Sequence, residues 1–398
     1  MKNKLLWRTT AAGGAPDSDV AEFTVGNDYL CDSRLVQYDC RASIAHAKLL
    51  LKMGIITKKE HAKLVSALKK IILLHKQGKF AVKRGDEDVH TKIENFLVKG
   101  LGKTGRKIHT FRSRNDQVLV ALRLYCRANL IEAKASIAGL SSALSSLAKK
   151  TKGVKMPGYT HMQRAMPSSV QLWAGSFMES LSQDLLAIDF ALRVNDENPL
   201  GSAAGYGLPF RIDKGVTTKE LGFSRHFKNP LYVQNTRAKT ELVSVFALLQ
   251  AMMTLNKLAS DLMLFTTKEF GFFSLPESMC TGSSIMPQKK NYDVLEIMRG
   301  NLGTVSGNFA SILTNSANLP SGYNRDAQLN KAKLMESFDV TLSSLKMASK
   351  VVKNLKVNKE NLESAASAEL YAAEEAMKMA MKGTPFREAY MKVSGKFR

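Results

Sequence analysis

Apolar residues recur along this chain at steps of three and four, the spacing that places them on one face of an α-helix. The clearest apolar stripe covers residues 170–192 and continues over about six turns. The same periodicity predicts further helices at 34–53, 58–77, 88–98, 115–150, 241–265, 289–315 and 326–352. Strand-like alternation is rare, so the pattern predicts an all-α fold.

The segment 241–265 differs from the other predicted helices because it is apolar nearly all round. Only Glu241, Lys257 and Asp261 are charged within it. A helix without a polar face is stable only when other helices surround it, so we expect this one at the centre of a helical bundle.

Composition is that of a large globular protein. The chain has 398 residues, of which 44% are hydrophobic and 23% charged, and this length suggests two or three domains. The four cysteines form no CxxC pair, so we expect neither a disulfide framework nor a zinc site, and a reducing cytoplasm is the default compartment. The N-terminal apolar run is too short for a signal peptide, and no apolar run has the length of a membrane span.

The net charge of +23 could indicate binding to nucleic acid or to an anionic membrane. The lysines are scattered through predicted helices such as 58–77 instead of being massed with aromatic residues, which favours a solvated basic surface. We therefore expect no nucleic acid and no membrane as partner. A general positive field would also attract a substrate with several carboxylates.

Residues 280–300 read CTGSSIMPQKKNYDVLEIMRG, and few of them have an evident role in packing. Gly282 gives the loop conformational freedom and Pro287 stiffens its exit, so Ser283 is displayed. If a helix starts at residue 288, Lys289 and Glu296 share one of its faces. A serine-rich turn that caps a helix is the simpler interpretation of such a loop.

Three other breaks between predicted helices carry polar clusters: HTFRSRNDQ at 109–117, PGYTHMQ at 157–163 and GYNRDAQLNK at 322–331. Arginines at a helix N-terminus suit a carboxylate ligand, although a capping cluster neutralised by Asp116 would look similar. His161 is a lone histidine, and such residues are usually structural. In the third cluster Gln328 and Lys331 would lie one turn apart on one helical face.

The loop matches GSSxMPxKxN and resembles the fumarase/aspartase superfamily, whose members break a C–N or C–O bond beta to a carboxylate and release fumarate. With RSRNDQV, PGYTHMQ and YNRDxQxxK, the chain resembles the argininosuccinate lyase family within it. The resemblance implies a three-domain all-α fold: a helical domain 1–110, a central long helical bundle 111–355 and a shorter than usual C-terminal domain 356–398. It also implies a homotetramer whose active sites are shared between subunits, and argininosuccinate as substrate.

The resemblance also assigns roles. Ser283 matches the loop base or acid, and His161, expected to pair with Glu296, matches the opposite group; which is acid and which is base stays open. Lys289 and Asn291 match the residues that stabilise the aci-carboxylate formed when the proton leaves. The residues that match substrate contacts are Asp32, His90, Ser113, Arg114, Asn115, Thr160, Tyr323, Gln328 and Lys331. The acidic run at 86–88 before His90 could suggest a metal, but acidic residues commonly open a helix, and we expect no metal and no cofactor.

Four positions depart from the family pattern. Phe111 replaces a usual glycine, Ala121 a usual aspartate, Asp28 a common serine of the substrate site, and Arg325 a lysine. Two alternatives remain open within this resemblance: an enzyme like adenylosuccinate lyase, and a non-catalytic structural relative such as those of the eye lens. RSRND and YNRDxQxxK argue against the first, and the intact Ser283 loop argues against the second.

Overall fold

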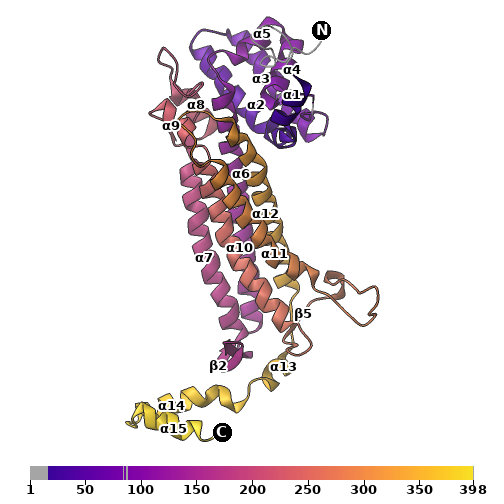
Figure 1. Ribbon diagram of the computed structural model, residues 1–398, viewed down its shortest axis with the longest axis vertical. Coiled ribbons are helices and arrows are strands. Elements are labelled where there is room, and N and C mark those ends of the chain that lie inside the picture. Colours follow the sequence, from indigo (N-terminus) through magenta and orange to yellow (C-terminus); the bar gives the residue numbers. More distant parts are fainter. Residues whose placement is uncertain (1–16, 84, 87, 398) are drawn as a thin grey trace. The chain divides into compact units, whose positions relative to one another are not determined.

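The computed structural model describes residues 17–83, 85, 86 and 88–397, and within them it is built almost entirely of helices. The prediction of an all-α fold is confirmed, and the few short strands pair into two-stranded sheets. Five long helices follow the N-terminal part of the chain (Figure 1): α6 (Arg114–Lys150), α7 (Val170–Asn195), α10 (Lys239–Phe265), α11 (Asp293–Asn315) and α12 (Asn330–Asn354). The chain forms two compact units, and each of these five helices contributes a part to both: unit 1 is Met1–Glu132, Ile188–Ala247 and Ser306–Asp339, and unit 2 is Ala133–Ala187, Leu248–Val305 and Val340–Arg398.

Unit 1 contains a group of helices from the N-terminal part of the chain (Figure 1). Its main members are α2 (Asp28–Lys52), α3 (Lys58–Lys76) and α4 (Val89–Leu101), which pack against one another. Thr57 and Glu60 form a reciprocal capping box that fixes the start of α3. Shorter helices complete the unit: α1 (Ser18–Val25), α5 (Lys103–Arg106), α8 (Lys214–Leu221) and α9 (Pro230–Asn235).

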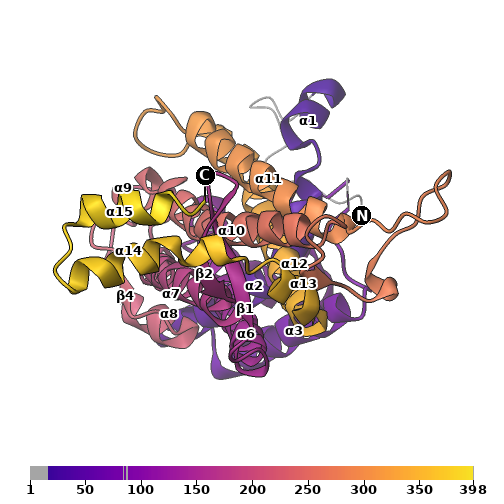
Figure 2. The ribbon, with the colours of Figure 1, turned by 90° about the horizontal axis from the view of Figure 1, so that it is seen from below.

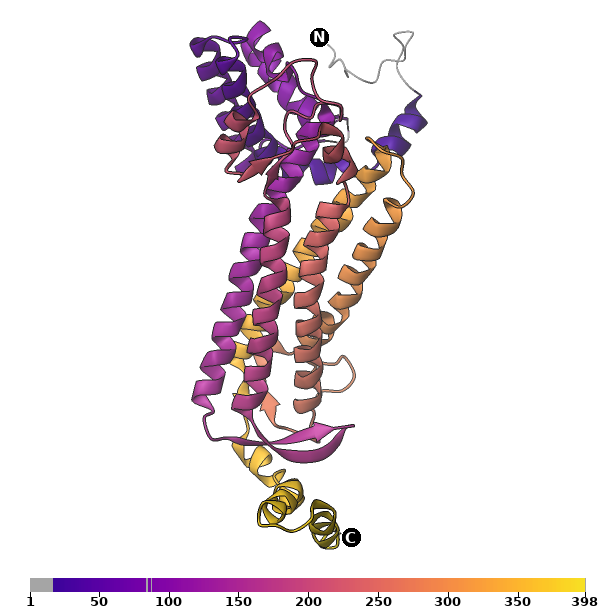
Figure 3. The ribbon, with the colours of Figure 1, turned by 90° about the vertical axis from the view of Figure 1, so that its left-hand side faces the viewer.

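Unit 2 contains an antiparallel hairpin of β1 (Lys155–Thr160) and β2 (Gln163–Ser169), seen in Figure 3. Its last residues form α13 (Lys359–Ser364), α14 (Ala372–Met381) and α15 (Phe386–Ser394). Figure 2 shows α14 and α15 side by side, and Ala376, Ala389 and Val393 form the small apolar core between them.

All the helices predicted from periodicity are present, with ends a few residues from the predicted ones. Three starts are wrong: α2 begins at Asp28 instead of residue 34, α11 begins at Asp293 instead of residue 289, and α12 begins at Asn330 instead of residue 326, after a 3₁₀ segment, Arg325–Leu329. The hairpin at 155–169 was not predicted. The division into three domains stays a prediction.

Helix α10 was predicted to be buried, and Leu248, Met252, Leu255 and Ala259 are indeed inaccessible. Contrary to the expectation that no apolar run has the length of a membrane span, the segment Pro230–Phe265, which includes α9, does have that length and composition. Half of its most apolar window, however, is already buried within this single chain. Burial of that extent is typical of a core helix in a helical bundle.

Candidate active site

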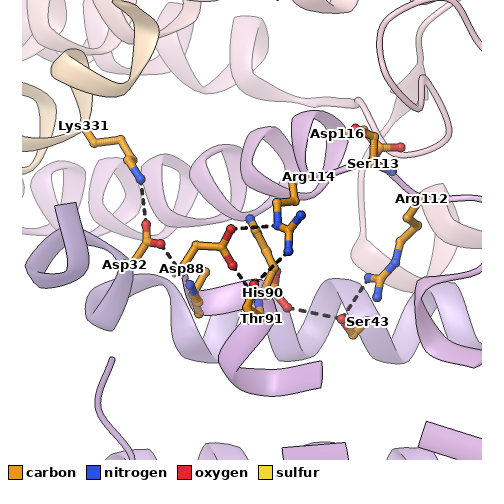
Figure 4. Close-up of polar contacts among 12 residues, drawn as sticks. Asp32, Ser43, Asp88, His90, Thr91, Arg112, Ser113, Arg114, Asp116 and Lys331 are labelled. Carbon is orange, nitrogen blue, oxygen red and sulfur yellow. Dashed lines mark hydrogen bonds and ion pairs between the residues drawn. The ribbon is translucent and has the colours of Figure 1, made fainter. Parts of the chain in front are cut away.

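One face of α2 presents acidic groups to the start of α12. The Nζ of Lys331 donates to Asp28 at 2.6 Å. It also donates to Asp32 at 2.7 Å (Figure 4), and the other oxygen of Asp32 accepts the backbone N–H of Val89 at 3.0 Å. Burial opposes a charge on Lys331, but the two carboxylates outweigh it and raise its pKa. Lys331 is therefore a buried cation held by two acidic groups.

This ion cluster forms part of the wall of a cavity of about 210 Å³. The lining residues all belong to unit 1 and come from α1, α2, the starts of α4 and α6, Arg237 and the segment 323–331. The structure thus gathers a majority of the predicted substrate-binding residues around one space: Asp32, His90, Arg114, Asn115, Tyr323, Gln328 and Lys331.

The first residues of α6 hold a guanidinium at the cavity. Arg114 Nε lies 2.9 Å from a carboxylate oxygen of Asp88, and its Nη2 donates to the hydroxyl of Thr91 at 2.9 Å (Figure 4). The hydroxyl of Ser113 accepts the backbone N–H of Asn115 at 3.2 Å, so Ser113 is turned to the helix start. The arginine is fixed in position, and an incoming carboxylate has to compete with Asp88 for it.

Asp116 has the structural role that a capping cluster would require. One carboxylate oxygen accepts the N–H of Ser113 at 3.1 Å, and the other accepts the N–H groups of Gly201 and Ala203 at 3.0 and 3.1 Å. Burial raises the pKa of Asp116 to about 6 despite these hydrogen bonds. The side chain ties the start of α6 to the loop at 199–207, and it is not a cavity residue.

The segment before α12 supplies Tyr323 and Gln328. Gln328 lies in the 3₁₀ segment and Lys331 in the first turn of α12, so they do not share one regular helix as predicted, but both line the cavity. The guanidinium of Arg237 stacks 4.7 Å from the ring centre of Tyr323 and donates to the backbone oxygen of Asn115 at 3.1 Å.

Two features of this region were missed by the sequence analysis. Arg237 carried no motif. The second feature, a polar stripe on α2, had a visible signal: Asp32, Asp39, Ser43 and His46 follow at steps of seven, four and three, which places them on one face, and all are buried. Four buried polar side chains on one helical face indicate a hydrogen-bonded network.

Thr160 and His161 lie in unit 2, at the tip of the β1–β2 hairpin. Thr160 pairs with Gln163, leaving His161 and Met162 as the two turn residues, with φ of 52° and 61°. Positive φ at both central positions is typical of a type I′ turn, which residues other than glycine and asparagine adopt at a cost. The turn presents both side chains to solvent.

The serine loop closes on itself before α11 begins. Thr281 and Asn291 exchange two backbone hydrogen bonds of 3.0 and 2.9 Å, and the Thr281 hydroxyl donates to Asp293 at 2.6 Å. Because this bridge uses the backbone of Asn291, the helix cannot extend back to Lys289. The prediction that Lys289 and Glu296 share one helical face is therefore wrong. Figures 1 and 2 show the loop between β5 (Phe273–Ser274) and α11 projecting from its neighbours in unit 2.

Inside this loop, Ser283 is surrounded by backbone donors. Its Oγ accepts the N–H of Ile285 at 3.3 Å and that of Met286 at 3.1 Å. The side-chain amide of Asn291 donates to the backbone oxygen of Gly282 at 3.2 Å. The loop conformation thus directs positive dipoles at the serine oxygen.

Several predicted catalytic groups have no polar partner within the described part of the chain. Lys290 pairs with Glu277 at 2.5 Å, whereas Lys289 forms no ion pair there. No hydrogen bond or ion pair among the described residues engages His161 or Glu296, so their pairing stays a prediction. The predicted site residues therefore fall into two sets. One lines the cavity of unit 1, with Ser113 beside it, and the other belongs to the hairpin tip, the serine loop and the first turn of α11.

Comparison with known proteins decides the family. A family model described as "Lyase" matches residues 18–307. The argininosuccinate lyase of Thermotoga neapolitana is 42% identical over 392 residues, which cover 98% of each chain. The chain belongs to the argininosuccinate lyase family.

Among solved structures, EDDS lyase in complex with formate superposes with a TM-score of 0.80 at 25% identity, covering 96% of this chain and 76% of that one. A class II fumarase from Schistosoma mansoni has a TM-score of 0.77 at 18% identity, covering 98% and 92%. The fumarase match shows a shared fold, and the lyase family is the one that the sequence motifs indicated.

Proposed function

We propose that this protein cleaves argininosuccinate into arginine and fumarate by β-elimination. The observation that carries the proposal is the cavity of unit 1, which gathers predicted substrate contacts of both charges in a chain 42% identical to an argininosuccinate lyase. Argininosuccinate carries carboxylates and cationic groups, so a cavity lined by Asp32, Arg114 and Lys331 suits both kinds of group.

Binding is divided between the two ends of the substrate. Arg114, Asn115 and Ser113, with Thr160, hold the carboxylates of the part that becomes fumarate. Asp32, Tyr323, Gln328 and Lys331 hold the arginine part, and His90 contacts the substrate beside them. Gln328 and Lys331 support this division because they line the cavity together, next to the stacked ring of Tyr323.

The chemical step needs a group that removes a weakly acidic proton beside a carboxylate. Ser283 serves as this group, or as the acid if the direction of proton transfer is reversed. An ordinary hydroxyl is far too weak a base, but two backbone N–H groups directed at its Oγ favour the deprotonated oxygen. Charge that develops on the substrate carboxylate is then stabilised by Lys289 and Asn291.

His161, paired with Glu296, acts on the opposite side of the cleaved bond. We propose that these groups reach the cavity from other copies of the chain, in a homotetramer with shared active sites. Large apolar side chains that stay exposed on the long helices support such an assembly. They are Ile131 on α6, Leu172, Leu186 and Phe190 on α7, Phe246 and Met253 on α10, and Ile297 and Leu313 on α11.

We place the reaction in the cytoplasm. All four cysteines are free thiols, and Cys31, Cys40 and Cys126 are buried. Free thiols are typical of a reducing compartment.

The direct test follows the absorbance of fumarate after purified protein is added to argininosuccinate and, separately, to adenylosuccinate. We expect fumarate and arginine in equal amounts from the first substrate only. Faster release from adenylosuccinate would assign the protein to that reaction instead. A folded protein inactive on both substrates would identify a non-catalytic relative.

A further inference from the structure

His90 lines the cavity with one ring nitrogen already engaged. Its Nδ1 lies 2.5 Å from a carboxylate oxygen of Asp39, and the side chains of the two residues are 7% and 1% exposed. No group in the described part of the chain bonds to the other nitrogen, Nε2. A ligand in the cavity can therefore meet only Nε2.

Asp39 is itself held in place by a second contact. Its other oxygen accepts the hydroxyl of Ser43 at 3.3 Å, and the oxygen of Ser43 accepts Nη1 of Arg112 at 2.9 Å. Ser43 follows Asp39 by one turn of α2, whereas Arg112 precedes α6. A buried carboxylate without partners would be costly, so this arrangement keeps Asp39 in place and ionised.

The charges around His90 come from each element that packs on it. Asp32 and Asp39 belong to α2 and Asp88 precedes α4. His109 and Arg112 both precede α6; His109 interacts with His90, and Arg112 interacts with Asp39. Burial opposes the charged imidazole, but Asp39 outweighs burial, with help from Asp88 and Asp32, and the pKa of His90 is raised. Burial likewise opposes ionisation of Asp39, yet His90 and Arg112 lower its pKa. Both shifts favour an imidazolium paired with a carboxylate.

We propose that Asp39, supported by Ser43 and Arg112, is a positioning residue that keeps His90 a cation whose Nε2–H binds a carboxylate of the substrate. The proposal rests on the proposed function for the identity of that carboxylate. It does not require His90 to exchange a proton during the reaction.

Asp39→Asn removes the negative charge of residue 39 but keeps the shape of its side chain. The asparagine oxygen can still accept Nδ1–H, so the ring stays in place, but the negative charge that outweighs burial is lost. Neutral His90 then presents a lone pair at Nε2, which repels a carboxylate. Anion binding in the wild type is present below the raised pKa of His90 and is lost as the pH rises through it. In Asp39→Asn the same loss occurs at lower pH.

The experiment measures equilibrium binding of fumarate and, separately, of arginine by calorimetry between pH 6 and pH 9. The His90 pKa is measured by NMR of the histidine rings, assigned with His90→Gln. At pH 7.5 we expect Asp39→Asn to bind one of the two products about 10-fold more weakly, and its His90 pKa to fall. Weakened fumarate binding places the contact on the succinyl part, and weakened arginine binding places it on the arginine carboxylate. Asp339→Asn, which removes a carboxylate of unit 1 outside the cavity, is the matched control and should leave both affinities unchanged.

An unchanged His90 pKa in Asp39→Asn, or unchanged affinity for both products, would overturn the proposal. If Asp39→Asn does not fold, the wild type decides. Its affinity for fumarate or arginine should fall above the measured His90 pKa, and this pH dependence should vanish in His90→Gln. These measurements use products and need no turnover, so their outcome is independent of the activity assay.

Discussion

The amino group of Lys331 lies 2.6 Å from a carboxylate oxygen of Asp28. Because Lys331 also binds Asp32, two carboxylates share one cation, and this wall of the cavity carries an extra negative charge. Burial raises the pKa of Asp28 to about 6, the repulsion of Asp32 adds to the effect, and Lys331 opposes it.

This shift predicts how Asp28→Asn changes stability with pH. A carboxyl group whose pKa is higher in the folded than in the unfolded protein stabilises the folded state when it is protonated. This stabilisation is lost as the pH rises from about 4 through 6. The amide that replaces it does not titrate, so the free energy of unfolding of Asp28→Asn, relative to wild type, should increase by about 1 kcal/mol between pH 5 and pH 7.5. Urea unfolding at one fixed protein concentration measures it. A difference that is the same at both pH values would contradict the shift.

Phe111 adopts a backbone conformation that glycine would adopt without strain. Its φ is 66°, in the left-handed region, and its ring packs edge-on against Phe210 with centroids 4.8 Å apart. The aromatic contact offsets part of the backbone strain. Phe111 is therefore a strained residue with a packing partner, whereas a glycine here would be relaxed but unpacked.

Two substitutions at this position separate strain from packing. Phe111→Ala and Phe111→Gly both lose the ring contact, but only glycine relieves the left-handed strain, so the glycine variant should be more stable by about 1 kcal/mol. Urea unfolding of the pair measures the difference. Ala121→Gly inside α6 is the control and should be destabilising instead, because glycine weakens a regular helix. A glycine variant no more stable than the alanine variant would mean that the strain is absent.

The helices were predictable because each long helix buries an apolar face whose residues recur at regular spacing. This spacing can be read directly from the sequence. The hairpin at 155–169 was not, because its turn places His161 and Met162 at positive φ, for which neither residue type gives a signal. The start of α11 was also mispredicted, because a backbone bridge from Thr281 to Asn291 competes with helix formation and joins residues ten apart.

The cavity was predictable only in part. The family resemblance named Asp32, His90 and Lys331, and these residues do lie around one space. The partners behind them come from other elements: Asp39 from the buried face of α2 and Arg237 from beyond α9. Pairing between elements depends on tertiary packing, which periodicity does not encode.

The serine loop predicts a difference between two adjacent residues. Ser283→Ala removes the hydroxyl at which two backbone N–H groups point, and it should lower turnover at least roughly 100-fold, as expected for loss of general acid–base catalysis. Ser284→Ala removes a neighbouring exposed hydroxyl to which we assign no role, and its loss should be much smaller. Circular dichroism checks that both variants fold. Equal losses would show that the loop conformation, not the Ser283 hydroxyl, carries the effect.

The last prediction concerns the origin of the catalytic groups. If His161 and Ser283 reach one site from different subunits, a chain with His161→Asn still supplies an intact Ser283, and a chain with Ser283→Ala still supplies an intact His161. Unfolding the two inactive proteins together and refolding them should produce mixed tetramers in which roughly a quarter of the sites combine both intact residues. The mixture should therefore recover activity that is absent when the two proteins are refolded separately and then combined.

Light scattering measures the assembly, and a tagged chain that co-purifies with its partner demonstrates subunit exchange. A monomer, or an inactive mixture in which exchange has been demonstrated, would exclude the shared site and would require His161 and Ser283 to act within one chain.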